Sequence, residues 1–316
     1  MDISIVIPLL NEAESLPELV SRIDQVMKEN KYYYELILVD DGSTDNSWDV
    51  INELKKDFAS VRGIKFRRNF GKSAALHTGF QATKGDVVMT MDADLQDSPE
   101  EIPGFFQMIT NEGYDLVSGW KKKRHDPLFR KNIPSKFYNW TARIMTGIKL
   151  HDFNCGIKAY RKRVVKSIEI YGDMHRFIPV LAKWAGFKKI GEKVVQHQER
   201  KYGTTKFGME RFMRGPLDLL SVMFISKYGK RPMHLFGTLG TLTFIFGFVM
   251  AAILGIKKLI AVSHHTLAPR VTQSPYFYIG LTCMVIGTLL FLSGFLGELI
   301  SRSSDNRNHY LIEEEF

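Results

Sequence analysis

The first 120 residues of the chain alternate between short apolar runs and longer stretches in which apolar side chains recur every three or four positions. The short runs have the length and composition of buried strands, and the three-and-four spacing is that of an amphipathic helix. The pattern predicts strands at residues 3–8, 35–41, 61–68, 86–92 and 114–120, with helices at residues 16–30, 45–58, 71–85 and 99–113.

This alternation predicts an α/β fold, in which crossover units build a mostly parallel sheet with helices on both faces. Ligands of such sheets bind at the carboxyl ends of the strands. Asp40 and Asp41 end the second predicted strand, and Asp92 and Asp94 end the fourth. Two pairs of acids are therefore expected at the same edge of the sheet.

The acids of the fourth strand belong to the segment "MTMDADLQDSPEE", residues 89–101, in a chain of 316 residues with a formal net charge of +9. Like charges repel, so either this is a solvated acidic turn or a positive partner binds there. Mg²⁺ and Mn²⁺ are hard cations that bind carboxylates together with phosphate oxygens of a substrate. We expect such a cation on Asp92 and Asp94, with a further oxygen from Gln96.

Other site classes lack their sequence signatures. No GxGxxG follows the first strand and no GxxxxGK[ST] occurs, which removes the dinucleotide and P-loop fingerprints. The two cysteines, Cys155 and Cys283, give neither a disulfide framework nor zinc-ligand spacing and suit a reducing compartment. The positive net charge indicates an anionic partner, which is a nucleic acid, a phosphorylated substrate or a membrane surface.

The last third of the chain is much more apolar. Residues 232–256 and 276–300 each exceed the roughly 20 apolar residues that cross a bilayer, the alternative being long buried helices of a soluble protein. Basic residues flank these segments at Lys227, Lys230, Arg231, Arg302 and Arg307, whereas the loop between them carries Lys257, Lys258 and Arg270. The flanks and the lack of an export signal after Met1 predict two transmembrane helices with both flanks in the cytoplasm.

The segment between the two regions is basic. Residues 121–207 are predicted to be rich in loops, and residues 209–228 mix aromatic, aliphatic and charged side chains. The latter pattern is typical of amphipathic helices at a membrane interface or of an ordinary docking helix. We expect a catalytic domain at 1–207, juxtamembrane helices at 208–231, the two spans within 232–300 and a cytoplasmic tail at 301–316.

Four ordered motifs, "VIPLLNE", "LVDDGSTD", "NFGKSAALHTGF" and "MDADLQDSPE", resemble those of the family 2 glycosyltransferases, which have a GT-A fold. The polyprenyl-phosphate glycosyltransferases are more similar still, a subgroup with the dolichol-phosphate mannose synthases and bacterial enzymes that load glucose onto undecaprenyl phosphate. The resemblance covers residues 1–207, and the two-span tail resembles the bacterial branch. It implies a GT-A, Rossmann-like sheet followed by interfacial and transmembrane helices.

The resemblance also implies which residues hold the donor. Pro8, Asn11 and Glu12 match a first nucleotide-binding loop, and Asp40 matches an acid that contacts the base or ribose. The full set of nucleotide-sugar positions is Pro8, Asn11, Glu12, Asp40, Lys72 and Asp92, and the metal and diphosphate positions are Asp92, Asp94 and Gln96. For Lys72, a capping or surface lysine is the alternative.

On the acceptor side, a lipid phosphate carries up to two negative charges and needs basic side chains close to the membrane. The positions that the resemblance implies are Lys121, Arg124, Arg130, Ser135, Arg200 and Lys206. In related enzymes an arginine often follows the Ser-Gly pair, whereas Trp120 and Lys121 follow Ser118-Gly119 here. Asp94 and Asp152 are the expected catalytic residues, with Asp152 either a base or a residue that positions the sugar.

The expected function is an inverting, metal-dependent transfer of a hexose from a nucleotide sugar to polyprenyl (undecaprenyl) phosphate, at the cytoplasmic face of a bacterial inner membrane. UDP-glucose is the favoured donor, with GDP-mannose and modified UDP-sugars as alternatives. A homo-oligomer such as a tetramer is expected, and no nucleic acid partner. The rivals are a processive polysaccharide synthase, whose Gln-x-x-Arg-Trp motif is missing here, and a silent scaffold or sensor, against which Asp92 and Asp94 argue.

Overall fold

The structure is a computed structural model, and the chain divides into two compact units, Met1–Val222 and Met223–Phe316. The described residues are 1–122, 143, 146–196, 198, 201, 224, 228, 231–265 and 270–302. The expected domain boundary at residue 207 and the expected interfacial helices at 208–231 lie almost entirely outside them, so both stay predictions.

The first unit is built on a seven-stranded sheet with the strand order β3-β2-β1-β4-β6-β5-β7. The strands are β1 (Ile3–Leu9), β2 (Tyr34–Asp40), β3 (Val61–Lys65), β4 (Val87–Thr90), β5 (Leu116–Trp120), β6 (Lys158–Arg161) and β7 (Ile190–Val194). Only β6 among them is antiparallel to its neighbours, β4 and β5. The mostly parallel sheet predicted from the sequence is confirmed.

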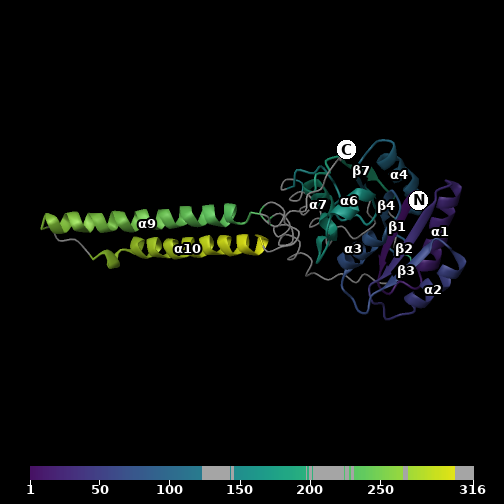
Figure 1. The fold of residues 1–316 in the computed structure, drawn as a ribbon, viewed down its shortest axis with the longest axis horizontal. Helices are drawn as coiled ribbons and strands as arrows, with labels where there is room; N and C mark the ends of the chain where they lie inside the picture. Colours follow the sequence, from purple (N-terminus) through teal and green to yellow (C-terminus); the bar gives the residue numbers. More distant parts are fainter. Residues whose placement is uncertain are drawn as a thin grey trace. The chain divides into compact units, whose positions relative to one another are not determined.

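Helices cover both faces of this sheet (Figure 1). They are α1 (Leu16–Glu29), α2 (Ser47–Asp57), α3 (Lys72–Ala82), α4 (Ile102–Thr110), α6 (Lys162–Ser167) and α7 (Ile178–Trp184), with short 3₁₀ helices η1 (Pro99–Glu101) and η3 (Met174–Phe177). Right-handed crossovers from β1 to β2 and β3 put α1 and α2 on one face, and the return to β4 puts α3 on the other. The strands β2 and β3 are therefore added on one side of β1, and β4 is added on its other side.

Alternate residues of the strands fill two apolar layers. Ile3, Ile5 and Ile7 of β1 pack in one cluster with buried side chains of α1, α2 and α4. On the opposite face, Phe80 of α3 makes an edge-to-face contact with Tyr160 of β6, their ring centroids 5.5 Å apart. Helix α3 packs on β1 and β2, and its first residue, Lys72, pairs with Asp92 just after β4, so its first turn lies at the carboxyl edge of the sheet.

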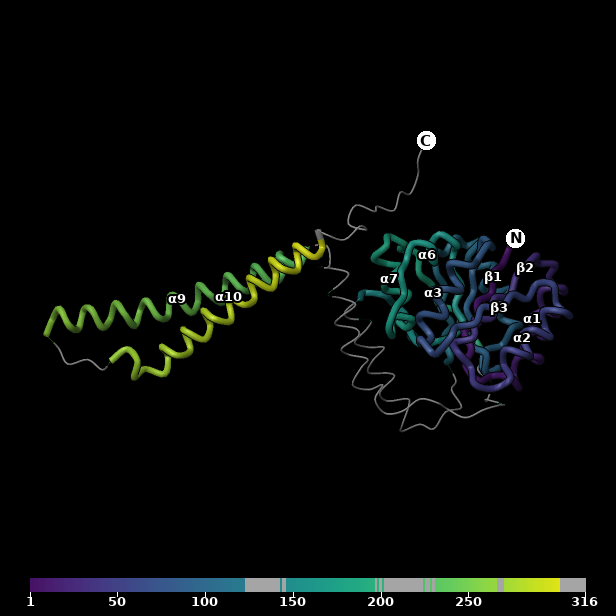
Figure 2. Tube along the Cα trace, turned by 60° about the horizontal axis from the view of Figure 1, so that its bottom comes forward, coloured from purple at the N-terminus to yellow at the C-terminus, as the bar shows by residue number. Residues whose placement is uncertain are grey.

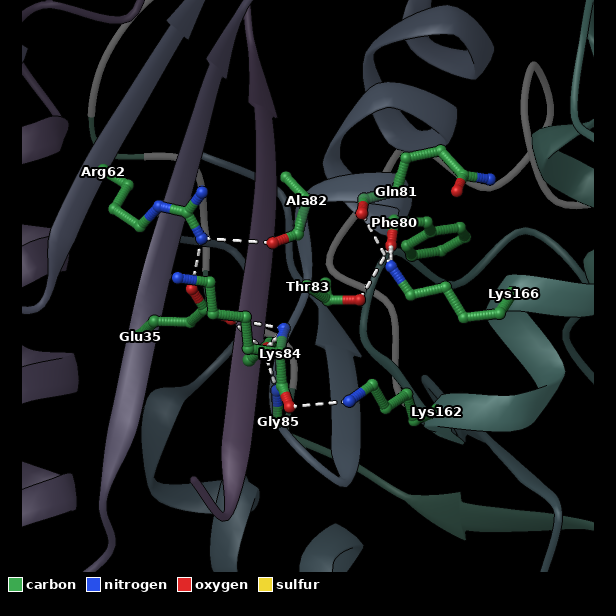
Figure 3. Close-up of polar contacts among 11 residues, drawn as sticks. Glu35, Arg62, Phe80, Gln81, Ala82, Thr83, Lys84, Gly85, Lys162 and Lys166 are labelled. Atoms are coloured by element: carbon green, nitrogen blue, oxygen red, sulfur yellow. Dashed lines mark hydrogen bonds and ion pairs between the residues drawn. The ribbon is translucent and has the colours of Figure 1, made fainter.

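The C-terminal end of α3 is held by polar contacts at the opposite, amino edge (Figure 3). Lys166 donates from Nζ to the carbonyl oxygens of Phe80 and Gln81, both at 2.7 Å. Beside them, the buried Glu35 carboxylate accepts from Ser4 Oγ and from the Lys84 backbone N–H, each at 2.6 Å, and also pairs with Arg62. This cluster fixes the orientation of α3.

The interpretation of residues 121–207 as loop-rich was incomplete, because β6, α6, η3, α7 and β7 all lie between Lys158 and Val194. These elements are short, and charged residues interrupt their apolar pattern. Lys158 and Arg161 begin and end β6, and Lys158 is buried there. A buried lysine in a four-residue strand conceals the alternation from which a strand is predicted.

The second unit contains α9 (Met233–Ser263), η4 (Val271–Gln273) and α10 (Pro275–Arg302), and the two long helices lie side by side (Figures 1 and 2). Both helices are long and apolar enough to span a membrane, with a mean hydropathy of 2.2. Helix α9 continues past the predicted end at residue 256 because Lys257 and Lys258 are good helix formers. Glycines allow the helices to pack closely: Gly240 faces the backbone of Gly287, and Gly247 that of Gly280.

Candidate functional site

The loops after β1 and β2 are tied together at the carboxyl edge of the sheet. Asn11, which has a left-handed φ of 53°, donates its N–H to Ser43 Oγ at 2.9 Å and accepts from the Thr44 N–H at 2.8 Å. The Glu12 N–H donates to Ser47 Oγ, also at 2.9 Å, and Pro8 lies opposite Val39 in the register of the sheet. The expected nucleotide loop therefore folds onto the start of α2.

Two adjacent acids lie beneath these loops. Asp40 is completely buried; its Oδ1 accepts the Ser43 N–H at 2.8 Å, and its Oδ2 has no hydrogen-bond partner among the described residues. Asp41 accepts backbone N–H groups of Phe70 at 2.7 Å and Gly71 at 2.9 Å, while burial raises the pKa of its carboxyl group. Asp41 thus fixes the loop after β3, whereas one oxygen of Asp40 is buried without a hydrogen bond from the described residues.

The acids after β4 lie on a strained turn. Asp94 is buried and accepts the Gln96 N–H at 3.2 Å, and Leu95 between them has a φ of 59°, unusual for a branched side chain. The Asp92 carboxylate is 31% exposed and pairs with Lys72 at the start of α3. Burial would raise the pKa of Asp92, but nearby ammonium groups, above all that of Lys72, lower it to about 2.

The residues present fit a hard divalent cation. Asp92 and Asp94 offer carboxylate oxygens from one short segment, and the low pKa keeps Asp92 ionised at neutral pH. No group of three or more His, Cys, Asp or Glu side chains suited to a metal occurs within the described part of the chain. Cations that bind substrate phosphates commonly take only one or two protein carboxylates. The metal-ligand roles of Asp92, Asp94 and Gln96 stay predictions.

Two lysines lie among the acids of this edge, a feature that the sequence did not reveal. Lys121 pairs with the buried Asp97 at 2.8 Å, which raises the pKa of the lysine despite its burial. Lys158 is 4% exposed and donates to the Cys155 carbonyl oxygen, and burial lowers its pKa. Lys121, expected at the acceptor phosphate, is therefore already engaged by a carboxylate.

Gly156 explains how these acids pack. A Cβ atom at this position would lie 2.4 Å from Asp92 Oδ2 and 2.8 Å from Asp97 Oδ2. Real Cβ atoms do not approach so closely, so only glycine leaves room for both carboxylates against the backbone. The Cys155 thiol beside it is buried, and burial raises its pKa. A protonated, buried thiol is a packing group rather than a nucleophile.

Asp152 is held by a residue that the sequence did not single out. Glu192 of β7 accepts, with one oxygen, the backbone N–H groups of His151 at 2.8 Å and Asp152 at 3.1 Å. Its other oxygen lies 2.7 Å from His151 Nδ1, and the His151 ring stacks on Trp120 with centroids 4.1 Å apart. Asp152 itself is buried and accepts the Asn154 N–H at 3.0 Å. Whether it is a base or a positioning residue stays a prediction.

A further polar group lies against the first turn of α3. His175 Nδ1 is 3.0 Å from Ser73 Oγ, and the His175 N–H donates to the same oxygen at 3.1 Å. Burial and the charges of Lys72 and Arg176 hold the pKa of His175 well below 6.5, so the ring is neutral at neutral pH. Sequence inspection gave no reason to connect His175 with Ser73, because 102 positions separate them.

Five of the predicted acceptor-phosphate residues lie outside the described residues. They are Arg124, Arg130, Ser135, Arg200 and Lys206. Their roles stay predictions. The structure does bring the donor-side residues to one edge of the sheet, at or just after the carboxyl ends of β1, β2 and β4 and at the start of α3.

Comparisons with known proteins agree with this architecture. A family profile described as glycosyl transferase family 2 matches residues 4–169. Dodecaprenyl-phosphate galacturonate synthase from Rhizobium johnstonii is 36% identical, over 100% of this chain and 93% of that protein. Undecaprenyl-phosphate 4-deoxy-4-formamido-L-arabinose transferases are 34% identical, the Proteus mirabilis protein over 99% of this chain and 93% of its own length, and the Aeromonas hydrophila protein over 95% and 88%.

Solved structures share the fold at low sequence identity. Mannosyl-3-phosphoglycerate synthase from Rubrobacter xylanophilus has a TM-score of 0.58 at 15% identity, covering 71% of this chain and 74% of its own. Glucosyl-3-phosphoglycerate synthase from Mycobacterium tuberculosis, in complex with Mn²⁺ and UDP-glucose, has a TM-score of 0.54 at 20% identity, covering 71% and 78%. The profile and the relatives establish that the chain belongs to glycosyl transferase family 2 and is a glycosyltransferase of the GT-A fold.

Proposed function

We propose that this enzyme transfers a sugar from a nucleotide sugar to a polyprenyl phosphate. The observation that carries the proposal is the carboxyl edge of the sheet, where the buried Asp40 has a free oxygen and Asp92 and Asp94 follow one another on a strained turn. This arrangement suits a nucleoside diphosphate. The relatives named for polyprenyl phosphates align over 95–100% of the chain, which includes both apolar helices, and thereby support a lipid acceptor.

The sugar is the least constrained part of this function. We expected glucose from the resemblance, but the named relatives transfer galacturonate and 4-deoxy-4-formamido-L-arabinose. Both are modified sugars, so the relatives support the alternative of a modified sugar better than glucose. We therefore propose a modified sugar as the transferred group and a uridine nucleotide as its carrier.

The proposed reaction is a single displacement with inversion. An oxygen of the lipid phosphate attacks the anomeric carbon while the bond between that carbon and the diphosphate breaks, and the nucleoside diphosphate leaves. The phosphate oxygen is already anionic near neutral pH, so the attack does not require a base. Asp152, fixed by Glu192 and Asn154, is then better suited to orient the sugar than to remove a proton.

Within this scheme Asp40, at the end of β2, is the acid that contacts the base or ribose of the donor. Asp92 and Asp94 would hold Mg²⁺ or Mn²⁺, which when bound neutralises charge on the diphosphate and makes it a better leaving group. The cation of Lys72 is near enough to Asp92 to contact the same diphosphate. Reaction at the cytoplasmic face of a bacterial inner membrane, and assembly into a homo-oligomer, remain parts of the proposal.

One assay tests this function. The full chain, purified in lipid nanodiscs with undecaprenyl phosphate and Mn²⁺ or Mg²⁺, is given a panel of nucleotide sugars: UDP-galacturonate, UDP-4-deoxy-4-formamido-L-arabinose, UDP-glucose and GDP-mannose. Mass spectrometry of the extracted lipid should show one sugar on one phosphate, formed from a modified donor and lost with EDTA. A polymer would instead indicate a processive synthase, and no product from any donor would refute the proposal.

A further inference from the structure

Arg176 is a buried cation for which the described residues provide no counter-charge. It lies in η3 and is 9% exposed, and its Nε has no hydrogen-bond partner in the part of the chain that the structure describes. No carboxylate of the described residues pairs with it, whereas Arg22, Arg62 and Arg163 pair with Glu100, Glu35 and Asp115. Buried charges in proteins are normally paired, because an unpaired one loses its hydration without compensation. A buried arginine left open in this way indicates a site for an anionic ligand.

The surroundings of Arg176 connect it to the donor site. Its neighbour His175 contacts Ser73 in the first turn of α3, at 3.0 Å, and the adjacent Lys72 reaches Asp92. The charged groups that shift the pKa of His175 include the cations Lys72, Arg176 and Lys158 and the carboxylate of Asp92. The N-terminal end of α3 adds positive potential to this region. His175 and Arg176 therefore lie beside the start of α3, where Lys72 reaches Asp92.

Resting on the function proposed above, we propose that Arg176 binds the carboxylate of a uronic acid in the donor, and that the sugar substrate is therefore a uronate. The planar guanidinium matches a carboxylate with two parallel hydrogen bonds. A neutral sugar would leave the buried cation unpaired in the complex. The relative that aligns with the whole of this chain is named for galacturonate, a sugar of this class.

The proposal makes opposite predictions for stability and for activity. An unpaired buried charge destabilises the protein that has no ligand, and apolar residues of similar volume often replace buried charges without loss of stability. Arg176→Met should therefore keep or raise the apparent melting temperature while it weakens use of a uronate. A residue with a purely structural role would behave in the other way, because its removal would lower the melting temperature.

The experiment compares UDP-galacturonate with UDP-galactose, which differ only in a carboxylate against a hydroxymethyl group. Full-length wild type, Arg176→Met and Arg176→Lys are assayed in nanodiscs with undecaprenyl phosphate, and donor binding is measured by calorimetry. Arg163→Met is the matched control, because Arg163 pairs with Asp115 outside the site. We expect wild type to prefer the uronate, and Arg176→Met to lose about 10- to 100-fold in kcat/KM for it with little change for UDP-galactose. The kcat/KM of Arg176→Lys for UDP-galacturonate should fall between the values for wild type and Arg176→Met.

Each other outcome overturns the inference in a different way. An equal loss with both donors would place Arg176 on a phosphate that the donors share or on the acceptor. A lower melting temperature with an unchanged preference would make the residue structural. Transfer of a neutral or formamido sugar but not of a uronate would reject the uronate and leave the proposed function standing. If no donor yields a lipid product, the proposed function fails, and calorimetry still shows whether Arg176 distinguishes the two donors.

Discussion

The buried polar groups at the two edges of the sheet differ in how completely they are hydrogen-bonded. At the amino edge, Glu35 accepts from Ser4, Lys84 and Arg62, and Lys166 binds the last carbonyl groups of α3 (Figure 3). At the carboxyl edge, polar atoms without a hydrogen-bond partner among the described residues include Asp40 Oδ2, Asn154 Oδ1 and Arg176 Nε.

The difference distinguishes a structural network from a binding site. Native proteins satisfy nearly all buried polar groups, so the exceptions need a separate explanation. Helix α3 runs between the two edges, with its C-terminal end held by Lys166 and its N-terminal end carrying Lys72 and Ser73. A rigid amino edge thus orients groups at the carboxyl edge whose partners are expected to come from the substrates.

The largest effect on activity is expected from substitution of the acids at the carboxyl edge. Asp92→Asn and Asp94→Asn should each lower turnover at least about 100-fold, because each removes a negative oxygen that would hold the cation and diphosphate. Mn²⁺ binding, followed by electron paramagnetic resonance, should weaken in parallel. Sugar incorporation into lipid is the activity measured.

Asp86→Asn is the matched control for those variants. Asp86 precedes β4 at the amino edge and is exposed, so the same chemical change is made at the other end of one strand. Its activity and Mn²⁺ binding should equal those of wild type. If Asp92→Asn and Asp94→Asn retain near-normal turnover, the carboxylates do not form the metal site.

Substitutions at the amino edge should instead lower the stability of the protein and leave its activity unchanged. Glu35→Ala leaves the buried Ser4 hydroxyl without its acceptor and the Lys84 N–H with only Ser4 Oγ, and the expected loss of unfolding free energy is about 2–5 kcal/mol. The apparent melting temperature measures it. The kcat/KM of the folded fraction should stay within about twofold of wild type, and a variant that stays stable but loses activity would contradict the comparison.

Much of the amino and carboxyl edges of the sheet could be predicted from local sequence. The apolar runs locate β1 to β5 to within a few residues, and Asp40, Asp92 and Asp94 follow because acids directly after buried strands must lie at their carboxyl ends. These features depend on neighbours along the chain. The four motifs predicted membership of the family 2 glycosyltransferases, which the profile match confirms.

The partners of these acids could not be predicted in this way. Ser73 and His175 are 102 residues apart, and His151 and Glu192 are 41 apart. Their contacts depend on the strand order β4-β6-β5-β7, which places late segments beside early ones. Lys158 and Arg176 are ordinary basic residues in the sequence, and only burial shows that they are unusual.

Substitution of Glu192 tests whether this residue positions Asp152 at the carboxyl edge. Glu192→Ala removes the acceptor of the His151 and Asp152 N–H groups, so the loop that carries Asp152 should loosen. We expect kcat to fall about 10-fold with little change in the KM for the donor, since misplacement of a positioned group mainly affects the transition state. Glu192→Gln should recover part of this loss because it keeps an acceptor oxygen.

Glu101→Gln is the control for the Glu192 variants, because Glu101 pairs with the next residue of β7, Lys193. It should leave kcat unchanged. Loss of donor affinity rather than kcat in Glu192→Ala would mean that Glu192 supports the donor pocket as a whole and not Asp152 in particular.

The smallest effect is expected at the cap of α3. Lys166→Met removes the amino group that donates to two carbonyl oxygens at the C-terminal end of the helix, which should lower stability by about 0.5–1 kcal/mol and leave activity unchanged. Burial and the charge of Lys162 lower the pKa of Lys166 below 10.5. Just below that pH the unfolded chain therefore binds more protons than the folded one, so wild type should gain stability relative to Lys166→Met as the pH rises. Melting temperatures of both proteins between pH 8 and about 10.5 measure the difference, and a gap that narrows with pH would show that the ammonium form stabilises the cap.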